Sequence, residues 1–466
     1  MAIEMSSPWI AGPVGAAAGA ALAWIASEYR TRKTYRNVLL LLAKSADDFA
    51  GAGDVDKALS IYDQILTDVP RLEPAVRGEI RFRQGLSRYG SSFEGAREKN
   101  LQMAVSAFED AISLFKPQRH PIEHARAQNG LGISLIRLSE TVGTAGGEAV
   151  LSGREGEEKV QNLKRAISAF EAALKIYAAE GRGQEEAQTE NNIGDAYLLL
   201  SKIEGPEAAE DLRKAIDAYE AALQFRTAEA HPEDRAETQT SLGRAWMALA
   251  ELEEGEMREA HLEKAVINLK AALEVRTLDS HPLERAETQT LLGQALVLGS
   301  EPQVSRAEIL SSDREGLKKA IEAYEEALCV RIRKAHPEEY AETKTLLGRA
   351  LVILSAPAKG PEDGANLKRA IGAFEEALAI RTLKEAPAKY AEIQNNLGVA
   401  YRSLSKLEDR EGNLERSILA YEEALRARAG GARRGEEKEK VEEEKVEEET
   451  SEEGAEGSRG EWDEGR

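Results

Sequence analysis

Small apolar residues recur along this chain in two short blocks, and the blocks alternate at a fixed distance. The first reads Ala-Ile/Val-x-x-Tyr/Phe/Leu-x-x-Ala, with apolar positions at the three- and four-residue steps of one helical face. The second reads Leu/Ile-Gly-x-Ala/Ser. Each first-block alanine precedes a second-block glycine by 28 residues, in the pairs Ala104–Gly132, Ala166–Gly194, Ala215–Gly243, Ala265–Gly293, Ala320–Gly348 and Ala370–Gly398.

This repetition predicts an array of helix hairpins. Each unit reads as helix A, a turn and helix B, and each needs its neighbours to bury its apolar face. The predicted units lie near residues 39–72, 76–117, 121–177, 184–226, 232–276, 282–332, 337–381 and 387–428. The fold class is therefore predicted to be an all-α solenoid of about eight helix-turn-helix repeats.

The two kinds of connection differ in length. From the helix-A glycine to the helix-B alanine of the same repeat the separation ranges from 19 to 34 residues, whereas the next alanine-to-glycine distance is constant. We therefore expect helix B and the following helix A to form the rigid joint between repeats. The longest A-to-B insertion, residues 140–160, includes five glycines and is predicted to be a mobile loop.

Polar residues mark the predicted helix starts. His-Pro pairs stand before four A helices, where proline favours the first helical position; the histidines are His120, His231, His281 and His336. A side chain suited to an N-cap lies four residues before most helix-B alanines. The predicted caps are Asp54, Asn100, Asn162, Asp211, Asn366 and Asn413.

The two ends of the chain differ from the repeats. Residues 8–26 carry no charge, and a helix of that length would span about 28 Å, close to the apolar thickness of a bilayer. Basic residues from Arg30 to Arg36 follow, which predicts a single membrane pass with the repeats in the cytosol. The alternative is a cytoplasmic protein in which this segment is a soluble capping helix. The predicted domains are an anchor segment at 1–36, a solenoid at 37–428 and a disordered acidic tail at 429–466.

The composition argues against several classes of function. The formal charge of −21 argues against a non-specific nucleic-acid binder, and a lone cysteine, Cys329, excludes an intrachain disulfide framework. We expect Cys329 to be a small buried residue. His120 and His124 are four residues apart with no third ligand nearby, and no phosphate loop or nucleophile elbow occurs. The sequence predicts no enzyme, cofactor or metal site.

The blocks resemble the tetratricopeptide repeat. Leu397, Gly398 and Tyr401 match its helix-A pattern, and Ala370 and Phe374 match its helix-B pattern. The long repeats are similar to the kinesin light chain subtype, with its Ala-Leu-x-x-Arg, His-Pro and Asn-Asn-Leu elements. The resemblance covers about residues 39–428. It implies a right-handed superhelix that recognises peptides or proteins on a concave helix-A surface; no motor role is implied.

That implied surface defines candidate binding residues by their distance from the helix-A glycine. The position three before it holds short polar side chains, and the position six before it holds a run of glutamates. The row three before the glycine includes Asn191, Thr240, Thr290, Thr345 and Asn395. The row six before it includes Glu237, Glu287, Glu342 and Glu392, and the position one after it includes Arg244 and Arg349. These rows suit an extended basic peptide; the alternative is a solvated face that balances its own charge.

A recurring arginine follows the helix-B alanine by eleven residues in the repeats from Ala215 onward. The set is Arg226, Arg276, Arg331, Arg381 and, at the equivalent place, Arg428. Near a helix C-terminus these cations suit the exposed carbonyls, and they can pair with a glutamate of the next helix. The predicted function is a membrane-tethered, non-enzymatic scaffold for protein or peptide partners. The alternatives are a soluble structural or regulatory scaffold and a receptor for basic targeting peptides. The sequence does not predict an oligomeric state.

Overall fold

The computed structural model describes residues 32–430 except 70–71, 94–95, 142–153, 204, 301–310 and 357. All regular structure in this part of the chain is helical. The predicted anchor at 8–26, most of the insertion loop and the tail from 431 onward lie outside the described residues. Among the helices that the structure describes, none is long and apolar enough to cross a bilayer.

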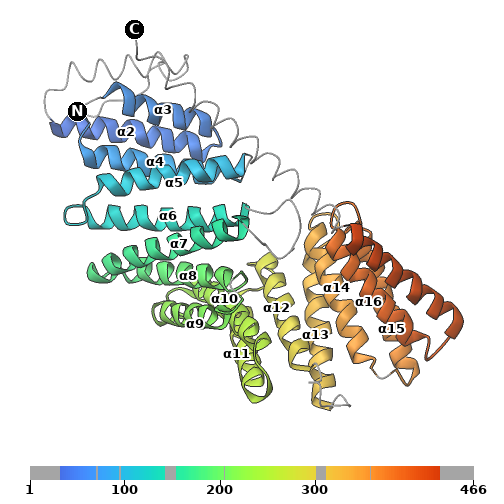
Figure 1. Cartoon of the computed structure of the whole chain (residues 1–466). Helices are drawn as coiled ribbons and strands as arrows, with labels where there is room; N and C mark the ends of the chain where they lie inside the picture. Colours follow the sequence, from blue (N-terminus) through green and yellow to red (C-terminus); the bar gives the residue numbers. More distant parts are fainter. Residues whose placement is uncertain are drawn as a thin grey trace, which may run out of the picture. The chain divides into compact units, whose positions relative to one another are not determined.

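The chain forms two compact units, whose described parts are residues 32–249 and residues 250–430. In the first unit, four antiparallel hairpins follow one another in chain order and α10 follows the last of them (Figure 1). Its helices are α2 (Arg32–Gly51), α3 (Val55–Asp68), α4 (Pro74–Ser91), α5 (Arg97–Leu114), α6 (Pro121–Thr141), α7 (Arg154–Ala179), α8 (Gly183–Leu200), α9 (Ala208–Phe225) and α10 (Pro232–Glu251).

The second unit begins with α11 (Gly255–Val275) and continues with three hairpins. These are formed by α12 (Pro282–Ser300) with α13 (Ser311–Val330), α14 (Pro337–Leu354) with α15 (Pro361–Leu378), and α16 (Pro387–Leu404) with a helix at 410–430. The helices begin and end within about four residues of the predicted repeats, except that α2 begins at Arg32, before the predicted start of the first repeat near residue 39. The all-α solenoid class is confirmed. The fifth repeat supplies α10 to the first unit and α11 to the second.

The signature alanines and glycines lie at the closest helix contacts. The alanines Ala104, Ala166, Ala215, Ala265, Ala320 and Ala370 are all completely buried. Helix-A glycines face the helix-B aromatic of their own hairpin: a Cβ added to Gly293 would lie 2.5 Å from Tyr324 Cε1, and one added to Gly348 would lie 2.5 Å from Phe374 Cε1. A and B of one hairpin also pack more extensively than B with the next A. The glycine therefore serves the hairpin itself and not the joint between repeats.

The constant B-to-A distance comes from a short, fully hydrogen-bonded turn. The carbonyls of His231 and His281 accept the backbone N–H four residues later, at 2.9 Å in both cases. The backbone N–H of each histidine donates in turn to the carbonyl of the threonine four residues earlier, at 3.0 Å. Proline then occupies the first helical position. This confirms the predicted structural role of the His-Pro pairs.

Most of the predicted N-caps are wrong. Asp54 does cap α3, with its side chain accepting from the Lys57 backbone N–H at 3.4 Å. The others lie inside their helices, which begin at least three residues earlier; these are Asn100, Asn162, Asp211, Asn366 and Asn413. Two of them bond back to the preceding connection: Asn100 Nδ2 donates to the Ser91 carbonyl at 3.3 Å and Asn413 Nδ2 to the Glu408 carbonyl at 2.8 Å. This position joins the two helices of a hairpin.

Candidate functional site

The predicted glutamate row lies on the solvent side of the A helices. Glu237, Glu342 and Glu392 are exposed, and Glu287 is half-buried. Glu237 belongs to α10 in the first unit, and the other three belong to α12, α14 and α16 in the second. Three successive A helices of the second unit thus present a carboxylate at the same register.

The short polar row is buried beneath the glutamates. Thr240, Thr290 and Thr345 are at most 5% exposed, and each hydroxyl donates at 2.8 Å to the carbonyl four residues earlier in its own helix. Asn191 is 2% exposed and Asn395 is half-buried. This row stands one turn after an alanine that is buried in every A helix, so it shares the packed side. The threonines support the helix contact and do not form an outer surface.

The residues one position after the helix-A glycine are intermediate in exposure between the glutamates and the threonines. Arg244 and Arg349 are half-buried, as is Asp195, which occupies the same place in α8. Arg244 and Arg349 follow Glu237 and Glu342 by seven residues, which places each pair on one face of its helix. The exposed face of α10 and that of α14 therefore carry both charges.

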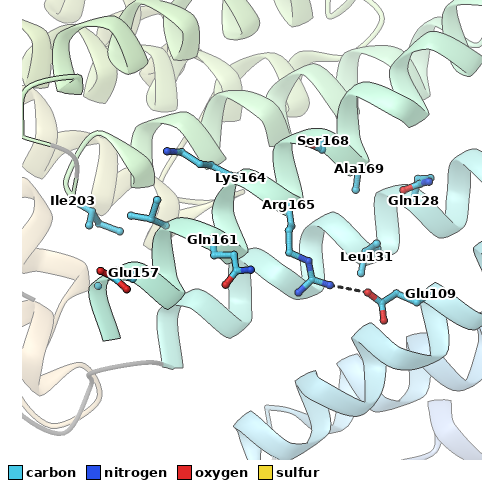
Figure 2. A pocket seen from close by; sticks show the side chains of 12 residues that line it. Glu109, Gln128, Leu131, Glu157, Gln161, Lys164, Arg165, Ser168, Ala169 and Ile203 are labelled. Atoms are coloured by element: carbon cyan, nitrogen blue, oxygen red, sulfur yellow. Dashed lines mark hydrogen bonds and ion pairs between the residues drawn. The ribbon is translucent and has the colours of Figure 1, made fainter. Parts of the chain in front are cut away.

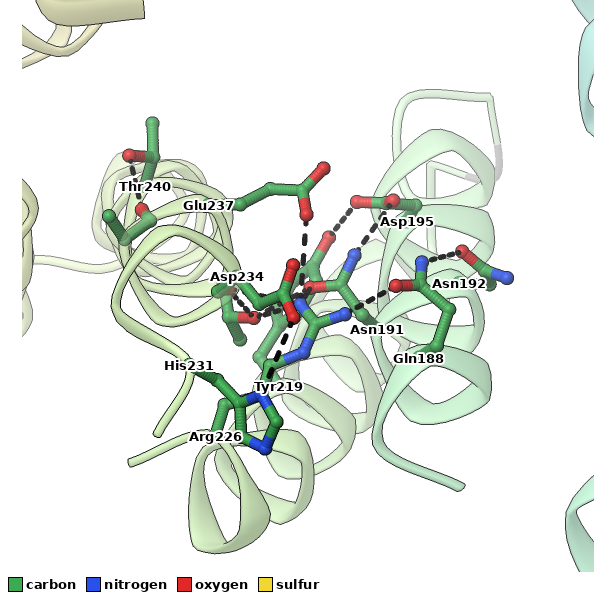
Figure 3. Close-up of polar contacts among 12 residues, drawn as sticks. Gln188, Asn191, Asn192, Asp195, Tyr219, Arg226, His231, Asp234, Glu237 and Thr240 are labelled. Atoms are coloured by element: carbon green, nitrogen blue, oxygen red, sulfur yellow. Dashed lines mark hydrogen bonds and ion pairs between the residues drawn. The ribbon is translucent and has the colours of Figure 1, made fainter. Parts of the chain in front are cut away.

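The recurring arginine holds three helices together. Arg226, just after α9, is only 2% exposed. Its guanidinium donates to Gln188 Oε1 at 2.5 Å and to Asn191 Oδ1 at 3.4 Å in α8, and to Thr238 Oγ1 at 2.6 Å in α10 (Figure 3). Glu237 lies 3.7 Å from the same guanidinium, which confirms the predicted pairing with the next helix. We call this arrangement the arginine clamp.

The clamp recurs in the second unit. Arg331 donates to Thr290 Oγ1 in α12 at 2.9 Å and to Thr343 Oγ1 in α14 at 3.1 Å. Arg381 differs because Ile393 stands where the next helix A would supply a threonine hydroxyl. Its guanidinium instead lies 3.4 Å from Glu338 and 3.9 Å from Glu342, both in α14. Two glutamates of the exposed row, Glu237 and Glu342, thus lie within ion-pair distance of a clamp arginine.

A half-buried acid, Asp195, adjoins the clamp in the first unit. Tyr219 Oη donates to Asp195 Oδ1 at 2.6 Å, and Asn191 Nδ2 donates to Asp195 Oδ2 at 3.3 Å (Figure 3). Burial raises the pKa of Asp195 to about 6, although the tyrosine hydrogen bond acts in the opposite direction. Burial and the neighbouring Asp195 also raise the pKa of Tyr219. This group links α8 and α9 below the exposed face.

The sequence analysis did not predict the side chains that cap the C-terminal end of helix B. Arg235 and Arg285 each lie eight residues before a helix-A glycine and donate to the carbonyls of Arg226 at 2.8 Å and Arg276 at 2.9 Å. His124 occupies the same position in α6, where its Nδ1 lies 2.7 Å from the Phe115 carbonyl oxygen. His124 is thus a structural cap. The described residues hold no cluster of three or more potential metal-ligating side chains.

A cavity of about 970 Å³ opens on the helix-B side of the first unit (Figure 2). It lies between α5, α6 and α7, and an ion pair of Arg165 with Glu109, 2.7 Å apart, crosses it. Gln128 and Leu131 of α6 contribute to its lining. No residue of the predicted binding rows lines it.

A smaller cavity of about 500 Å³ repeats this arrangement between α13, α14 and α15. Arg369 and Glu325 form the corresponding ion pair across it. Cys329 lines this cavity and is exposed, so its predicted burial is wrong. It lies nine residues after the buried Ala320, half a turn beyond the packed face of α13.

No family model and no curated protein matches the chain. The C-terminal part of a TPR repeat-containing protein from Cytophaga hutchinsonii matches at 12% identity over 72% of this chain and 95% of that chain, with a TM-score of 0.40. BtubC from P. vanneervenii matches at 19% identity over 60% and 92%, with a TM-score of 0.37. A human IFIT1 dimer with m7Gppp-AAAA matches at 17% identity over 90% of both chains, with a TM-score of 0.30. At these values the similarities say nothing about function.

Proposed function

We propose that this chain is a non-enzymatic scaffold that binds protein partners on the exposed faces of its A helices. The observation that carries the proposal is the repeated, accessible glutamate of α12, α14 and α16. A regular row of like charges on successive repeats suits an extended ligand with basic side chains at regular intervals. The arginine clamp joins α8 to α10 and α12 to α14, so these helices are held in register before a partner arrives.

Arg349 adds to this surface in the second unit, and Arg244 lies on the corresponding face of α10 in the first unit. Each lies on the same helical face as a glutamate of the row and has N–H donors suited to the main-chain carbonyls of an extended partner. The buried threonines contribute by fixing the helices beneath. Asn395 is the half-buried amide at this register in α16, and it completes the polar contact surface.

A peptide array tests this proposal. The full chain is incubated with unrelated 15-residue peptides of graded net charge, alongside a variant with Glu237, Glu287, Glu342 and Glu392 changed to Gln. The wild type should retain Lys- and Arg-rich peptides, and the variant should lose at least tenfold in signal. The matched control changes four exposed helix-B glutamates to Gln, namely Glu220, Glu263, Glu274 and Glu322. Equal binding by the wild type and the first variant would refute the proposal.

The proposal extends to the location of the scaffold. Residues 8–26 would tether the solenoid to a membrane as a single pass, with the repeats in the cytosol. The uncharged segment and its basic flank support this arrangement. A soluble scaffold capped by the same segment is the alternative, and a receptor for basic targeting peptides is a narrower form of the tethered scaffold. The long repeats and their His-Pro turns support a kinesin-light-chain-like subtype.

A further inference from the structure

The helix at 410–430 leaves uncovered the positions that other B helices bury. Ile418 is 57% exposed and Leu425 is 65% exposed. The corresponding residues of α15 are Ile371, which is 8% exposed, and Leu378, which is partly buried against the core. Leu414, at 37%, likewise stands where other B helices have a leucine that is at most 4% exposed.

The difference has a simple cause. The B helix of the preceding hairpin, α15, is covered by the next helix, α16. Leu397 and Leu404 of α16 join the same apolar cluster as Ile371 of α15. No described helix follows residue 430. Residues 431–466 contain only Val441, Val446 and Trp462 as large apolar side chains, so their sequence does not supply a matching apolar helix face. An apolar end of this kind on a repeat array needs a cover.

We propose that a second copy of this chain covers the face, with the two 410–430 helices packed antiparallel about a two-fold axis. A two-fold contact requires a self-complementary surface. With the axis between residues 420 and 421, Leu414, Ile418 and Leu425 of one copy alternate along the contact with the same residues of its partner. The same register sets Glu415 of each copy opposite Arg426 of the other, on one flank.

Charge favours this occupant. The helix contains four arginines and four glutamates, whereas the whole chain carries a net charge of −21. Two copies repel over most of their surface and can meet at a neutral apolar face. An occupant of opposite charge would find no excess of either sign here. This inference is independent of the function proposed above.

Native mass spectrometry of the full chain, released from detergent micelles, tests the proposal. The wild type should appear at twice its 50.9 kDa mass. The double variant Ile418→Glu/Leu425→Glu should be monomeric, with at least a tenfold weaker dimer. The matched control Ile267→Glu/Leu278→Glu places two acids at residues of similar exposure, 58% and 54%, and should remain dimeric. A monomeric wild type, or a dimer that survives the first substitution, would overturn the proposal.

A charge exchange tests the register even if the apolar variant fails to fold. Glu415→Arg should weaken the dimer several-fold because it places a cation against Arg426 of the partner copy. Adding Arg426→Glu should restore most of the loss. A double variant as weak as the single one, or a single variant with unchanged dimerisation, would contradict the antiparallel pairing.

Discussion

At the scale of single residues, the packing of each hairpin depends on a glycine in helix A, which has no side chain. The aromatic ring of helix B occupies the space that a Cβ would take on the helix-A glycine, as Tyr324 does at Gly293 and Phe374 at Gly348. Backbone and ring therefore approach more closely than any other residue pair would allow. Glycine costs about 1 kcal/mol of helix propensity, and its retention in every A helix from α6 onward indicates that the contact outweighs this cost.

Replacing Gly293 with Leu should destabilise the second unit by about 1–3 kcal/mol or more through overpacking. Urea unfolding followed by far-UV circular dichroism measures the change. The control is Gly372→Ala in α15, where an added Cβ meets no atom within 4 Å. That substitution should stabilise by about 0.5–1 kcal/mol. Equal midpoints for Gly293→Leu and the wild type would show that the ring and the glycine are not in contact.

The raised pKa of Asp195 predicts that stability depends on pH. Its pKa is raised from 3.8 to about 6, so the folded chain holds this proton more tightly than the unfolded chain. Its contribution is therefore fully present below about pH 4 and is lost as the pH rises through 6. The unfolding free energy of the wild type minus that of Asp195→Asn should fall by up to about 3 kcal/mol between pH 4 and pH 7. Parallel pH curves for the two proteins would exclude this role.

At the scale of helices, the arginine clamp explains how successive A helices keep their register. Arg226 joins α8 to α10 from the end of α9, and Arg331 joins α12 to α14 in the same way. A single buried guanidinium thus satisfies side chains on both neighbouring A helices. The exposed glutamates sit on the surface that this clamp fixes.

Removing one clamp should loosen three helices. Arg226→Met leaves the acceptors of Gln188, Asn191 and Thr238 without their shared donor and should cost about 1–3 kcal/mol. Faster hydrogen exchange in α8 and α10 than in α4 would report the loss. The control Arg97→Met removes an arginine that is 45% exposed in an ion pair with Glu140, and it should change stability by less than about 1 kcal/mol. Uniformly faster exchange along the chain would argue against a local clamp.

Sequence reasoning located the helices well because the alanine and glycine positions report direct helix contacts. It failed where a residue's role depends on the neighbouring hairpin. Asn100 has the chemistry of an N-cap, yet helix α5 begins at Arg97 and the amide reaches back to Ser91. Thr240 has a binding side chain by type, but its register places it on the packed side. The recurring arginine and its pairing with the next helix were predictable from local spacing. Its contacts with the preceding helix A were not, because the clamp joins residues up to 47 positions apart, as Thr238 and Asn191 are.

At the scale of the whole molecule, the chain combines two packed units with segments of very different composition at its ends. Residues 8–26 are uncharged, whereas residues 436–466 contain fifteen acidic and five basic side chains. The proposed scaffold function has two parts, a membrane tether at the N-terminal segment and a binding surface on the repeats. Both parts can be tested separately.

The proposed tether predicts that the full chain stays with membranes after extraction in alkaline carbonate. Deleting residues 1–36 should move the chain to the supernatant while leaving its helical circular dichroism unchanged. This control separates membrane insertion from binding of the repeats to a membrane protein. Recovery of the full chain in the supernatant would leave the soluble scaffold as the remaining form of the proposal.

Carboxyl footprinting is the most direct test of the binding surface. The chain is labelled with a carbodiimide and an amine, with and without the strongest basic peptide from the array, and modification is read by mass spectrometry. We predict protection of Glu237, Glu287, Glu342 and Glu392, with Glu220 and Glu322 of the B helices unchanged. Protection of the helix-B glutamates with the helix-A row fully labelled would contradict the account.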